Sequence, residues 1–380
     1  MSPGRDGIAP LIFHKSASQA PASSGTGVGP APILLPGGHR PKKPFTRRYG
    51  DRSQRMRAGV QLAFMAVTLL VGVQFYFWVR YYETGGESWK VARPPGVEAW
   101  LPIAALMNLK DFVLTGTVPE IHPAGMFMLI AFLAISWMYR KSFCSWICPV
   151  GTLSEWLWKG GEATFGRNFA LPRWFDIPLR SLKYVLFALF AYVVVTMPVP
   201  DIREFLSTPY GLVADVKMLN FFRRMGRTTA IVLSLLVLLS VFVKNFWCRY
   251  LCPYGAMTGL VALVSPTRIR RDPVACIDCA KCAKACPAGL PVDAALSIRS
   301  AECTACMSCV AVCPAVGALD LKTGLRRHAV VPPWALAAAV TVVFLGIVGY
   351  ARAAGYWQTA LPEARLFDLI PKAAEFSHPR

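Results

Sequence analysis

Eight cysteines in the last third of the chain have the spacing of iron–sulfur ligands. The run C-x2-C-x2-C-x3-C-P extends from Cys276 to Pro287 and is repeated, 27 residues later, from Cys303 to Pro314. At this spacing the first three thiolates of each run hold one 4Fe–4S cluster, and the fourth reaches the other cluster. The chemistry predicted is therefore electron transfer through two clusters with exchanged fourth ligands. The two ligand sets are Cys276, Cys279, Cys282 and Cys313, and Cys303, Cys306, Cys309 and Cys286.

Disulfide bonds explain this cysteine pattern poorly. All 12 cysteines lie in tightly spaced groups, and none is left over. A secreted disulfide framework distributes its cysteines differently, whereas grouped cysteines fit metal ligation in a reducing compartment. We therefore expect metal-bound thiolates rather than disulfides.

The other four cysteines form a second repeat, in which each copy reads C-x3-C-P. The segment from Phe143 to Gly151 aligns with the segment from Trp247 to Gly255, 104 residues later. If these segments are helical, cysteines four positions apart project from the same face, and the following proline ends the helix locally. Two such pairs that face each other supply the four thiolates that a third iron–sulfur centre requires. The candidate ligands of this third centre are Cys144, Cys148, Cys248 and Cys252.

Three other interpretations of the C-x3-C-P cysteines stay open at this stage. The pairs can act in thiol–disulfide exchange, bind copper or zinc, or serve as small buried hydrophobic side chains. Trp146 and Tyr250 lie between the cysteines, where an aromatic ring can shield a cluster or lie at a membrane interface. Arg249 can offset the negative charge of thiolates.

Long apolar segments indicate that the chain is embedded in a membrane. Hydrophobic residues make up 54% of the sequence and the mean hydropathy is +0.42, which is too high for a soluble protein. Each of five segments is long enough to cross a hydrocarbon core of about 30 Å as a helix. The predicted transmembrane helices are 58–79, 121–139, 184–200, 228–243 and 329–351. The apolar stretch 99–109 is too short, so we predict an interfacial or re-entrant segment.

Basic residues predict the orientation of these five helices. Lys and Arg number 28 in the segments on one side of the predicted membrane and 13 in those on the other. Because positively charged loops stay in the cytoplasm, the N-terminus and the ferredoxin runs are predicted to be inside and the C-terminus outside. The net charge of +20 therefore reflects membrane topology, and we expect no nucleic-acid partner.

These patterns predict a mainly α-helical membrane bundle with an inserted α+β two-cluster ferredoxin domain. Residues 1–57 are predicted to be a disordered basic cytoplasmic tail without a cleavable signal peptide, because they contain no apolar stretch of sufficient length. Residues 58–269 form a four-helix membrane region with both C-x3-C-P motifs, 270–325 the ferredoxin domain, and 326–380 the last transmembrane helix with an outer tail.

Several other cofactors and ligands are not expected. The chain has no C-x-x-C-H motif and no histidine in the middle of a predicted span, so neither c-type nor transmembrane b-type haem is predicted. It also has neither a P-loop nor a dinucleotide fingerprint, so no nucleotide is expected. His122 at the outer end of the second span is either a quinol-site residue or, more simply, a capping or solvated histidine. Segments 93–102 and 215–224 either line a quinone entry or lie in the membrane interface.

The cysteine motifs resemble those of one known family. Cys144-Ser-Trp-Ile-Cys148-Pro-Val-Gly, Cys248-Arg-Tyr-Leu-Cys252-Pro-Tyr-Gly and the double ferredoxin run are similar to the motifs of NapH-type membrane polyferredoxins. The resemblance covers about residues 58–372. It implies a multi-pass protein of the bacterial inner membrane, with a cytoplasmic ferredoxin domain, that passes electrons between the quinone pool and a redox protein.

The same resemblance limits the kind of function that we expect. It implies an electron-transfer protein, or a subunit of a quinol-linked oxidoreductase, rather than a stand-alone enzyme. Two alternatives remain: a metal-handling assembly factor that binds copper at the C-x3-C-P cysteines and reduces it, and a redox sensor that signals to a regulator.

Overall fold

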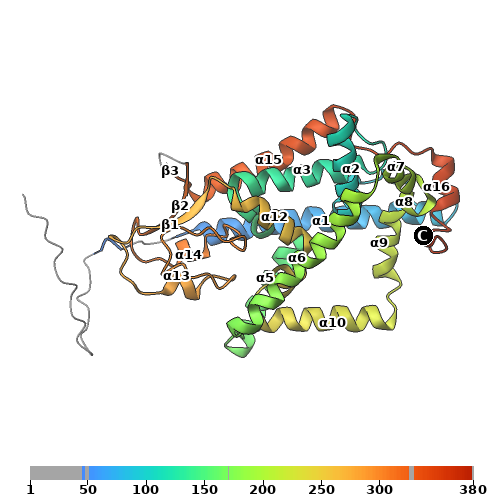
Figure 1. Ribbon diagram of the computed structural model, residues 1–380. Helices are drawn as coiled ribbons and strands as arrows, with labels where there is room; N and C mark the ends of the chain where they lie inside the picture. Colours follow the sequence, from blue (N-terminus) through green and yellow to red (C-terminus); the bar gives the residue numbers. More distant parts are fainter. Residues whose placement is uncertain (1–44, 48–50, 170, 325–328, 379–380) are drawn as a thin grey trace, which may run out of the picture. The chain divides into compact units, whose positions relative to one another are not determined.

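The computed structural model describes residues 45–47, 51–169, 171–324 and 329–378 and is mainly α-helical (Figure 1). Most of the predicted N-terminal tail lies outside the described residues, and the first helix begins at Ser53, within the range predicted to be disordered. The long helices are α1 (Ser53–Glu83), α3 (Pro123–Tyr139), α5 (Pro149–Phe165), α6 (Arg173–Thr196), α10 (Arg227–Phe242) and α15 (Pro333–Ala353).

Shorter helices and one small sheet connect the long helices. The short helices are η1 (Pro95–Trp100), α2 (Pro102–Thr115), η2 (Arg140–Ser142), α4 (Phe143–Trp146), α7 (Val199–Ser207), α8 (Pro209–Leu212), α9 (Ala214–Arg223), α11 (Phe246–Tyr250), α12 (Pro253–Leu263), α13 (Lys281–Lys284), α14 (Ser308–Ala311) and α16 (Glu363–Leu369). The strands are β1 (Arg268–Arg271), β2 (Leu319–Thr323) and β3 (Ala329–Val330).

Four helical segments of the described chain are long and apolar enough to cross a membrane, and a fifth candidate is bent. The four are Ser53–Glu83, Pro123–Trp146, Trp174–Thr196 and Pro333–Ala353. The span predicted at 228–243 is α10, whose 16 residues rise about 24 Å, less than the core of a bilayer. It qualifies together with α9, across a bend of 81°. The chain leaves the helical conformation at Arg224, so the fifth candidate is a broken helix pair.

The two C-x3-C-P motifs are brought together because the helices on either side of one motif pack against those on either side of the other. Helix α5, which follows the first motif, packs against α10, which precedes the second, and α12, which follows the second motif, packs against α3. The contact of α5 with α10 is close, since a Cβ added to Gly161 would lie 2.1 Å from the carbonyl oxygen of Val241. This packing places two segments that are 104 residues apart beside each other.

The segment from β1 to β3 has the α+β character predicted for a ferredoxin domain. Its strands form an antiparallel sheet in the order β1-β2-β3, with Ile269 opposite Leu321. The apolar core beneath this sheet continues into the helical bundle, where it includes Phe143 and Trp146 beside the first C-x3-C-P motif. The ferredoxin segment therefore packs directly on the helices that carry the other cysteines.

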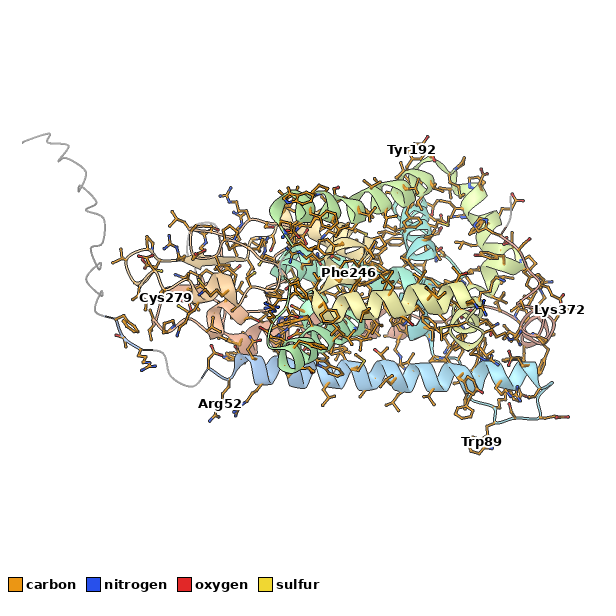
Figure 2. All side chains as sticks on the ribbon, turned by 90° about the horizontal axis from the view of Figure 1, so that it is seen from below. Arg52, Trp89, Tyr192, Phe246, Cys279 and Lys372 are labelled. Carbon is orange, nitrogen blue, oxygen red and sulfur yellow. The ribbon has the colours of Figure 1, made fainter. Side chains whose placement is uncertain are left out.

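The end of the bundle opposite the ferredoxin segment is closed by short helices. Cys279 and Lys372 mark these two ends in Figure 2. The stretch 99–109, predicted to be interfacial or re-entrant, forms the end of η1 and the first half of α2, which packs against α3, α6 and α7. Asn108 on α2 is buried and donates hydrogen bonds to the carbonyl oxygens of Ile121 and His122, at 2.8 and 3.0 Å. This stretch therefore packs against the bundle, with Trp100 and Ile103 on its exposed side.

Candidate metal centres

The structure gathers the eight ferredoxin cysteines in the two predicted sets. The distal group lines one cavity and consists of Cys276, Cys279, Cys282 and Cys313. The proximal group lines a second cavity, next to the helical bundle, and consists of Cys286, Cys303, Cys306 and Cys309. In each group three cysteines come from one run and the fourth comes from the other run, as the spacing predicts.

The backbone of the two cysteine loops fits a cubic cluster. Two and four positions after the first cysteine of each run, non-glycine residues have positive φ, and these are Asp278, Ala280, Ala305 and Met307. The left-handed conformation costs an L-residue about 1–2 kcal/mol and persists where the surrounding structure requires it. Turns of this kind point backbone N–H groups into a common concavity, in which many iron–sulfur clusters are bound.

The two groups differ in their exposure. Cys279 of the distal group is exposed, whereas Cys303 and Cys309 of the proximal group are buried. Burial raises the pKa of the Cys309 thiol and, together with the neighbouring Cys306, raises the pKa of Cys286 to about 11. The free thiols of Cys286 and Cys309 would therefore be protonated, so metal binding there must displace their protons.

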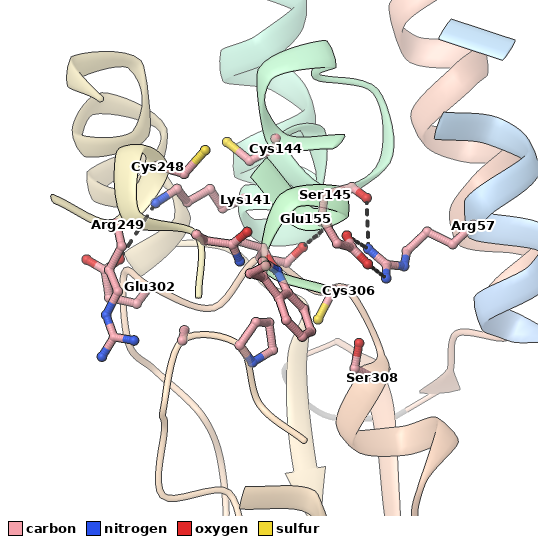
Figure 3. Close-up of a pocket in the computed structure, with 16 residues that line it drawn as sticks. Arg57, Lys141, Cys144, Ser145, Glu155, Cys248, Arg249, Glu302, Cys306 and Ser308 are labelled. Atoms are coloured by element: carbon pink, nitrogen blue, oxygen red, sulfur yellow. Dashed lines mark hydrogen bonds and ion pairs between the residues drawn. The ribbon is translucent and has the colours of Figure 1, made fainter. Parts of the chain in front are cut away.

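The C-x3-C-P cysteines converge from two helical turns. Each motif starts in a short helix, α4 or α11, and ends at the residue before the next helix, so Cys148 precedes α5 and Cys252 precedes α12. The two cysteines of a motif therefore do not lie on one continuous helix, because the prolines that follow begin new helices. The thiol of Cys248 interacts electrostatically with the other three. Figure 3 shows Cys144 and Cys248 pointing toward each other. We call these four cysteines the four-thiol site.

The surroundings of the four-thiol site favour negative charge. The amide of Gly255 donates a hydrogen bond of 3.3 Å to the Sγ of Cys252, and the Sγ of Cys144 lies 3.8 Å from the hydroxyl of Thr258. The N-termini of α5 and α12 meet the site, and helix N-termini stabilise anions. The buried Lys141 interacts electrostatically with three of the four thiols. Thiolates that ligate a metal centre therefore fit this site.

A buried ion cluster joins the four-thiol site to the proximal group. The Nζ of Lys183 lies 2.7 and 2.6 Å from the two carboxylate oxygens of Glu302, the residue before Cys303. Lys141 lies 3.8 Å from the same carboxylate, and the hydroxyl of Tyr184 donates to it at 3.1 Å. Burial raises the pKa of Glu302, but the two lysines outweigh this effect and lower it.

The peptide turn of the first motif contacts the proximal loop directly. Ser145 Oγ donates a hydrogen bond of 2.7 Å to the carbonyl oxygen of Thr304, and Trp146 Nε1 donates one of 3.2 Å to that of Ala305. Ser145 and Trp146 lie between the two cysteines of their motif, and Thr304 and Ala305 lie between Cys303 and Cys306. The turn of the first C-x3-C-P motif and the loop of the proximal group are thus hydrogen-bonded to each other.

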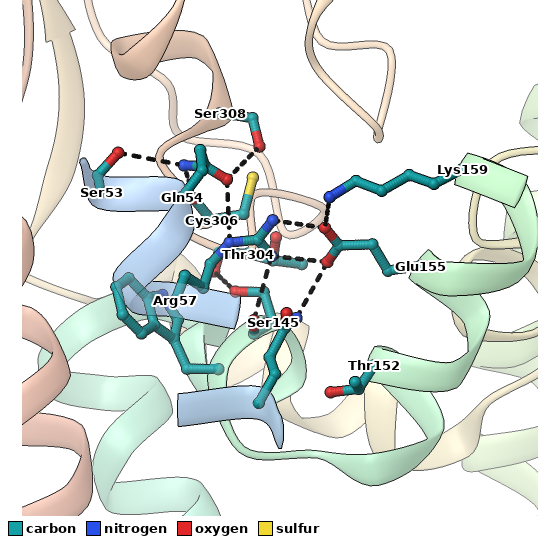
Figure 4. Close-up of polar contacts among 12 residues, drawn as sticks. Ser53, Gln54, Arg57, Ser145, Thr152, Glu155, Lys159, Thr304, Cys306 and Ser308 are labelled. Carbon is teal, nitrogen blue, oxygen red and sulfur yellow. Dashed lines mark hydrogen bonds and ion pairs between the residues drawn. The ribbon is translucent and has the colours of Figure 1, made fainter. Parts of the chain in front are cut away.

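The start of α1 holds the same interface together (Figure 4). Arg57 is buried and donates to both carboxylate oxygens of Glu155, at 2.6 and 2.5 Å, and to the carbonyl oxygen of Ser145, at 3.3 Å. Gln54 donates to the carbonyl oxygen of Cys306 at 3.1 Å. Burial raises the pKa of Glu155, but Arg57 and Lys159 outweigh it and lower the pKa to about 2, so the pair is ionic.

No compact single-ion site is formed in the described part of the chain. Within residues 45–47, 51–169, 171–324 and 329–378, no group of three His, Cys, Asp or Glu side chains is arranged to hold one metal ion. A bound copper or zinc ion needs such a group of converging ligands.

Two residues considered as cluster partners have other roles in the structure. Tyr250 and Arg249 both bind Asp176, with a hydrogen bond of 2.6 Å from the Tyr250 hydroxyl and an ion pair of 2.9 Å from Arg249. Lys141, Lys183 and Glu302 could not be selected from the sequence, since single charges near an apolar segment resemble ordinary flanking residues. Of these, only Glu302 had a feature in the sequence that pointed to the site, because it immediately precedes the predicted ligand Cys303.

The simpler role predicted for His122 was a capping or solvated histidine. His122 is the N-cap residue of α3, although its side chain makes no capping hydrogen bond. It is buried, and its Nε2 donates to the carbonyl oxygen of Gly211 at 2.9 Å. Its Nδ1 lies 3.4 Å from the carboxylate of Glu98. A solvated histidine is therefore excluded, because an acidic residue 24 positions earlier in the chain folds back against it.

Substitution of Gly151 is expected to disrupt the four-thiol site. A Cβ at this position would lie 2.0 Å from the carbonyl oxygen of Cys144, whereas one at the equivalent Gly255 would lie 3.2 Å from that of Cys248. Overpacking of this kind costs about 1–3 kcal/mol or more. Gly151→Ala should lower the thermal stability and iron content of the full-length protein strongly, and Gly255→Ala weakly.

Gly160→Ala is the matched control for this pair, because Gly160 lies in the same helix as Gly151 and faces open space. Removing a helical glycine there should stabilise the protein by up to about 1 kcal/mol. Equal losses from Gly151→Ala and Gly160→Ala would show that the close contact with Cys144 is not what matters.

Two family models match the chain in the regions that carry the cysteines. The model described as "4Fe-4S binding domain" matches residues 121–172 and 227–271, which include both C-x3-C-P motifs. The model described as "4Fe-4S dicluster domain" matches residues 268–314. No solved structure matches the chain significantly.

Curated relatives agree with these matches. The "Putative electron transport protein YccM" of Escherichia coli is 47% identical over 326 residues, which cover 85% of this chain and 91% of YccM. The "Ferredoxin-type protein NapH" of the same organism is 25% identical over 49% of this chain and 59% of NapH. "Protein NirI" of Paracoccus denitrificans is 29% identical over 51% of this chain and 28% of NirI. The chain therefore belongs to the NapH-type family of iron–sulfur electron transport proteins.

Proposed function

We propose that this protein carries electrons between the quinone pool of a membrane and a redox protein through three iron–sulfur centres. The distal and proximal groups each hold a 4Fe–4S cluster, and the four-thiol site holds a third centre. When bound, these clusters supply one-electron chemistry, and the protein supplies their ligands, burial and hydrogen bonds. The ferredoxin segment lies in the cytoplasm, as the distribution of Lys and Arg favours.

The contact between the two metal-ligating loops is the observation that carries this proposal. Trp146 and Ser145 belong to the four-thiol site, and they donate hydrogen bonds to the loop of the proximal group. The proximal group in turn shares its cysteine runs with the distal group. The three centres would therefore be adjacent in the order four-thiol site, proximal group and distal group.

The distal group is the exchange point with a soluble partner. Cys279 is exposed, and Val274, which precedes Cys276 by two residues, is 84% exposed. An exposed cluster edge with an apolar side chain beside it allows close approach of another redox protein. The buried proximal group is shielded from such contact and passes electrons inside the protein.

The proposal is tested with full-length protein, purified without oxygen and placed in lipid nanodiscs. We expect a menaquinol analogue to reduce the clusters, or the matching quinone to oxidise reduced clusters, and EPR to show the change. Dithionite reduction is the control for intact clusters. Clusters that respond to dithionite but to neither quinol nor quinone would contradict the link to the quinone pool. Copper binding that depends on Cys144 and Cys248, without quinol reactivity, would favour an assembly factor instead.

A further inference from the structure

The end of the bundle remote from the ferredoxin segment contains a cavity that none of the candidate cluster ligands lines. It has a volume of about 150 Å³, which is enough for one six-membered aromatic ring, because an engineered cavity of about this size binds benzene. Its polar lining comes from Arg93, Asp215, Gln358 and Thr359. The apolar lining includes Trp78, Leu212, Val213, Val216, Leu366 and Ile370.

The polar lining is a built site of buried charges. The guanidinium of Arg93 lies 2.7 Å from the carboxylate of Asp215 and 2.8 Å from that of Glu98, and it lies over the ring of Trp78, 5.8 Å from the centroid. The side chain of Asp215 is 2% exposed and that of Glu98 is fully buried. The Thr359 hydroxyl donates to Glu98 at 2.9 Å. Burial raises the pKa of Glu98, but Arg93 and His122 outweigh it and lower the pKa to about 2.

This site is connected to the four-thiol site through η1. The hydroxyl of Tyr254 donates a hydrogen bond of 3.2 Å to the carbonyl oxygen of Ala99, the neighbour of Glu98 in η1. Tyr254 lies two residues after Cys252 and interacts electrostatically with the thiols of Cys252 and Cys148. One aromatic side chain therefore separates the turn that carries Glu98 from the candidate third centre.

We propose that this cavity binds the headgroup of a quinol, an inference that rests on the proposed link to the quinone pool. A quinol presents an apolar ring with two opposed hydroxyl groups. Trp78 and the aliphatic side chains would contact the ring, Arg93 would hydrogen-bond its oxygens, and Asp215 would accept its protons. Thr359 would position Arg93 and Glu98, because its hydroxyl donates to Glu98 and accepts a hydrogen bond of 3.4 Å from Arg93. The two segments that line the site, 93–102 and 215–224, were candidates for a quinone entry from sequence alone.

The chemistry at this site balances in two equal steps. In each step one O–H bond of the quinol breaks, its proton goes to the Asp215 carboxylate, and one electron leaves past Tyr254 toward the iron–sulfur centres. Asp215 releases the proton to water before the second step. After two steps the quinol has become a quinone, two protons have been released, and the centres have gained two electrons. Reduction of a quinone would follow the same route in reverse.

Two substitutions test the site in the full-length protein. Asp215→Asn removes the proton acceptor, and Thr359→Val removes a hydroxyl while keeping the shape of the side chain. A positioned general base contributes about 100-fold or more to a rate, so Asp215→Asn should slow cluster reduction by a menaquinol analogue by about that factor. Thr359→Val should weaken the binding of a fluorescent quinone analogue. Neither should change dithionite reduction or iron content.

Asp111→Asn is the matched control. The side chain of Asp111 is 3% exposed, and it forms an ion pair of 2.7 Å with Arg203 without lining the cavity. It should leave quinol reactivity unchanged. If the unmodified protein reacts with quinol while Asp215→Asn and Thr359→Val react as fast and bind the analogue as tightly, this site is wrong and the proposed function stands. If the unmodified protein does not react with quinol or quinone, both are wrong.

Discussion

A Cys286→Ser variant is expected to lose the proximal cluster and to keep the distal cluster, although Cys286 follows the distal cysteines in the sequence. Cys286 lines the cavity of the proximal group, and the distal group is completed by Cys313 from the second run. Iron–sulfur clusters select soft thiolate ligands, which a serine hydroxyl does not replace. Anaerobically purified protein should therefore lose about four irons per chain, the content of one cubic cluster.

Double variants show which cluster has been lost. Cys286→Ser combined with Cys309→Ser removes two ligands of the same cluster, so it should lose no more iron than Cys286→Ser alone. Cys286→Ser combined with Cys279→Ser removes one ligand from each cluster and should lose about eight irons. The reverse pattern, in which the second combination adds no further loss, would contradict the exchanged ligands.

The second large effect is expected from Glu302→Gln, which removes the carboxylate between the helical bundle and the proximal group. The side chain of Lys183 is fully buried, and its ammonium is bound by both carboxylate oxygens. Breaking a buried ion pair on one side costs about 3–5 kcal/mol, because the other charge stays buried without its partner. We expect a clear fall in thermal stability and faster proteolysis between α12 and β1, where the ferredoxin segment joins the bundle.

A second substitution shows whether Glu302→Gln destabilises the protein because it leaves the Lys183 ammonium unpaired or because it alters packing. Lys183→Met added to Glu302→Gln removes the unpaired ammonium, so it should restore part of the stability. Asp368→Asn breaks an exposed pair with Lys372 and should leave thermal stability nearly unchanged, because solvent screens exposed ion pairs. If Glu302→Gln is as mild as Asp368→Asn, the ion cluster does not hold the two parts together.

The cysteine groups could be predicted from the sequence because ligand spacing is a local property. Two residues separate neighbouring cysteines in the run Cys276, Cys279 and Cys282. This short spacing keeps the three side chains close enough to line one cavity. The fourth cysteine of each group was also predictable, because a cysteine before a proline recurs in both runs. The helical character, the apolar spans and the small α+β segment followed from composition and periodicity in the same way.

The interactions between distant segments were not predictable in this way. Lys183 and Glu302 are 119 residues apart, and nothing in either neighbourhood indicates the other. The same holds for Trp146, whose ring was assigned to shielding or to the membrane interface and whose N–H binds Ala305. The buried position of His122 could not be predicted without knowing that Glu98 lies beside it. Likewise, the sequence did not show that α10 is long enough to cross a membrane only together with α9, across a bend. Apart from the bend between the neighbouring helices α9 and α10, these features depend on tertiary packing between segments that are far apart in the sequence.

Iron and acid-labile sulfide per chain, measured on full-length protein purified without oxygen, test the central claim most directly. Three cubic centres predict about twelve of each per chain, and about eight would remove the centre at the four-thiol site. Colourless protein without iron, in which the ferredoxin cysteines are paired with one another as disulfides, would contradict the whole account.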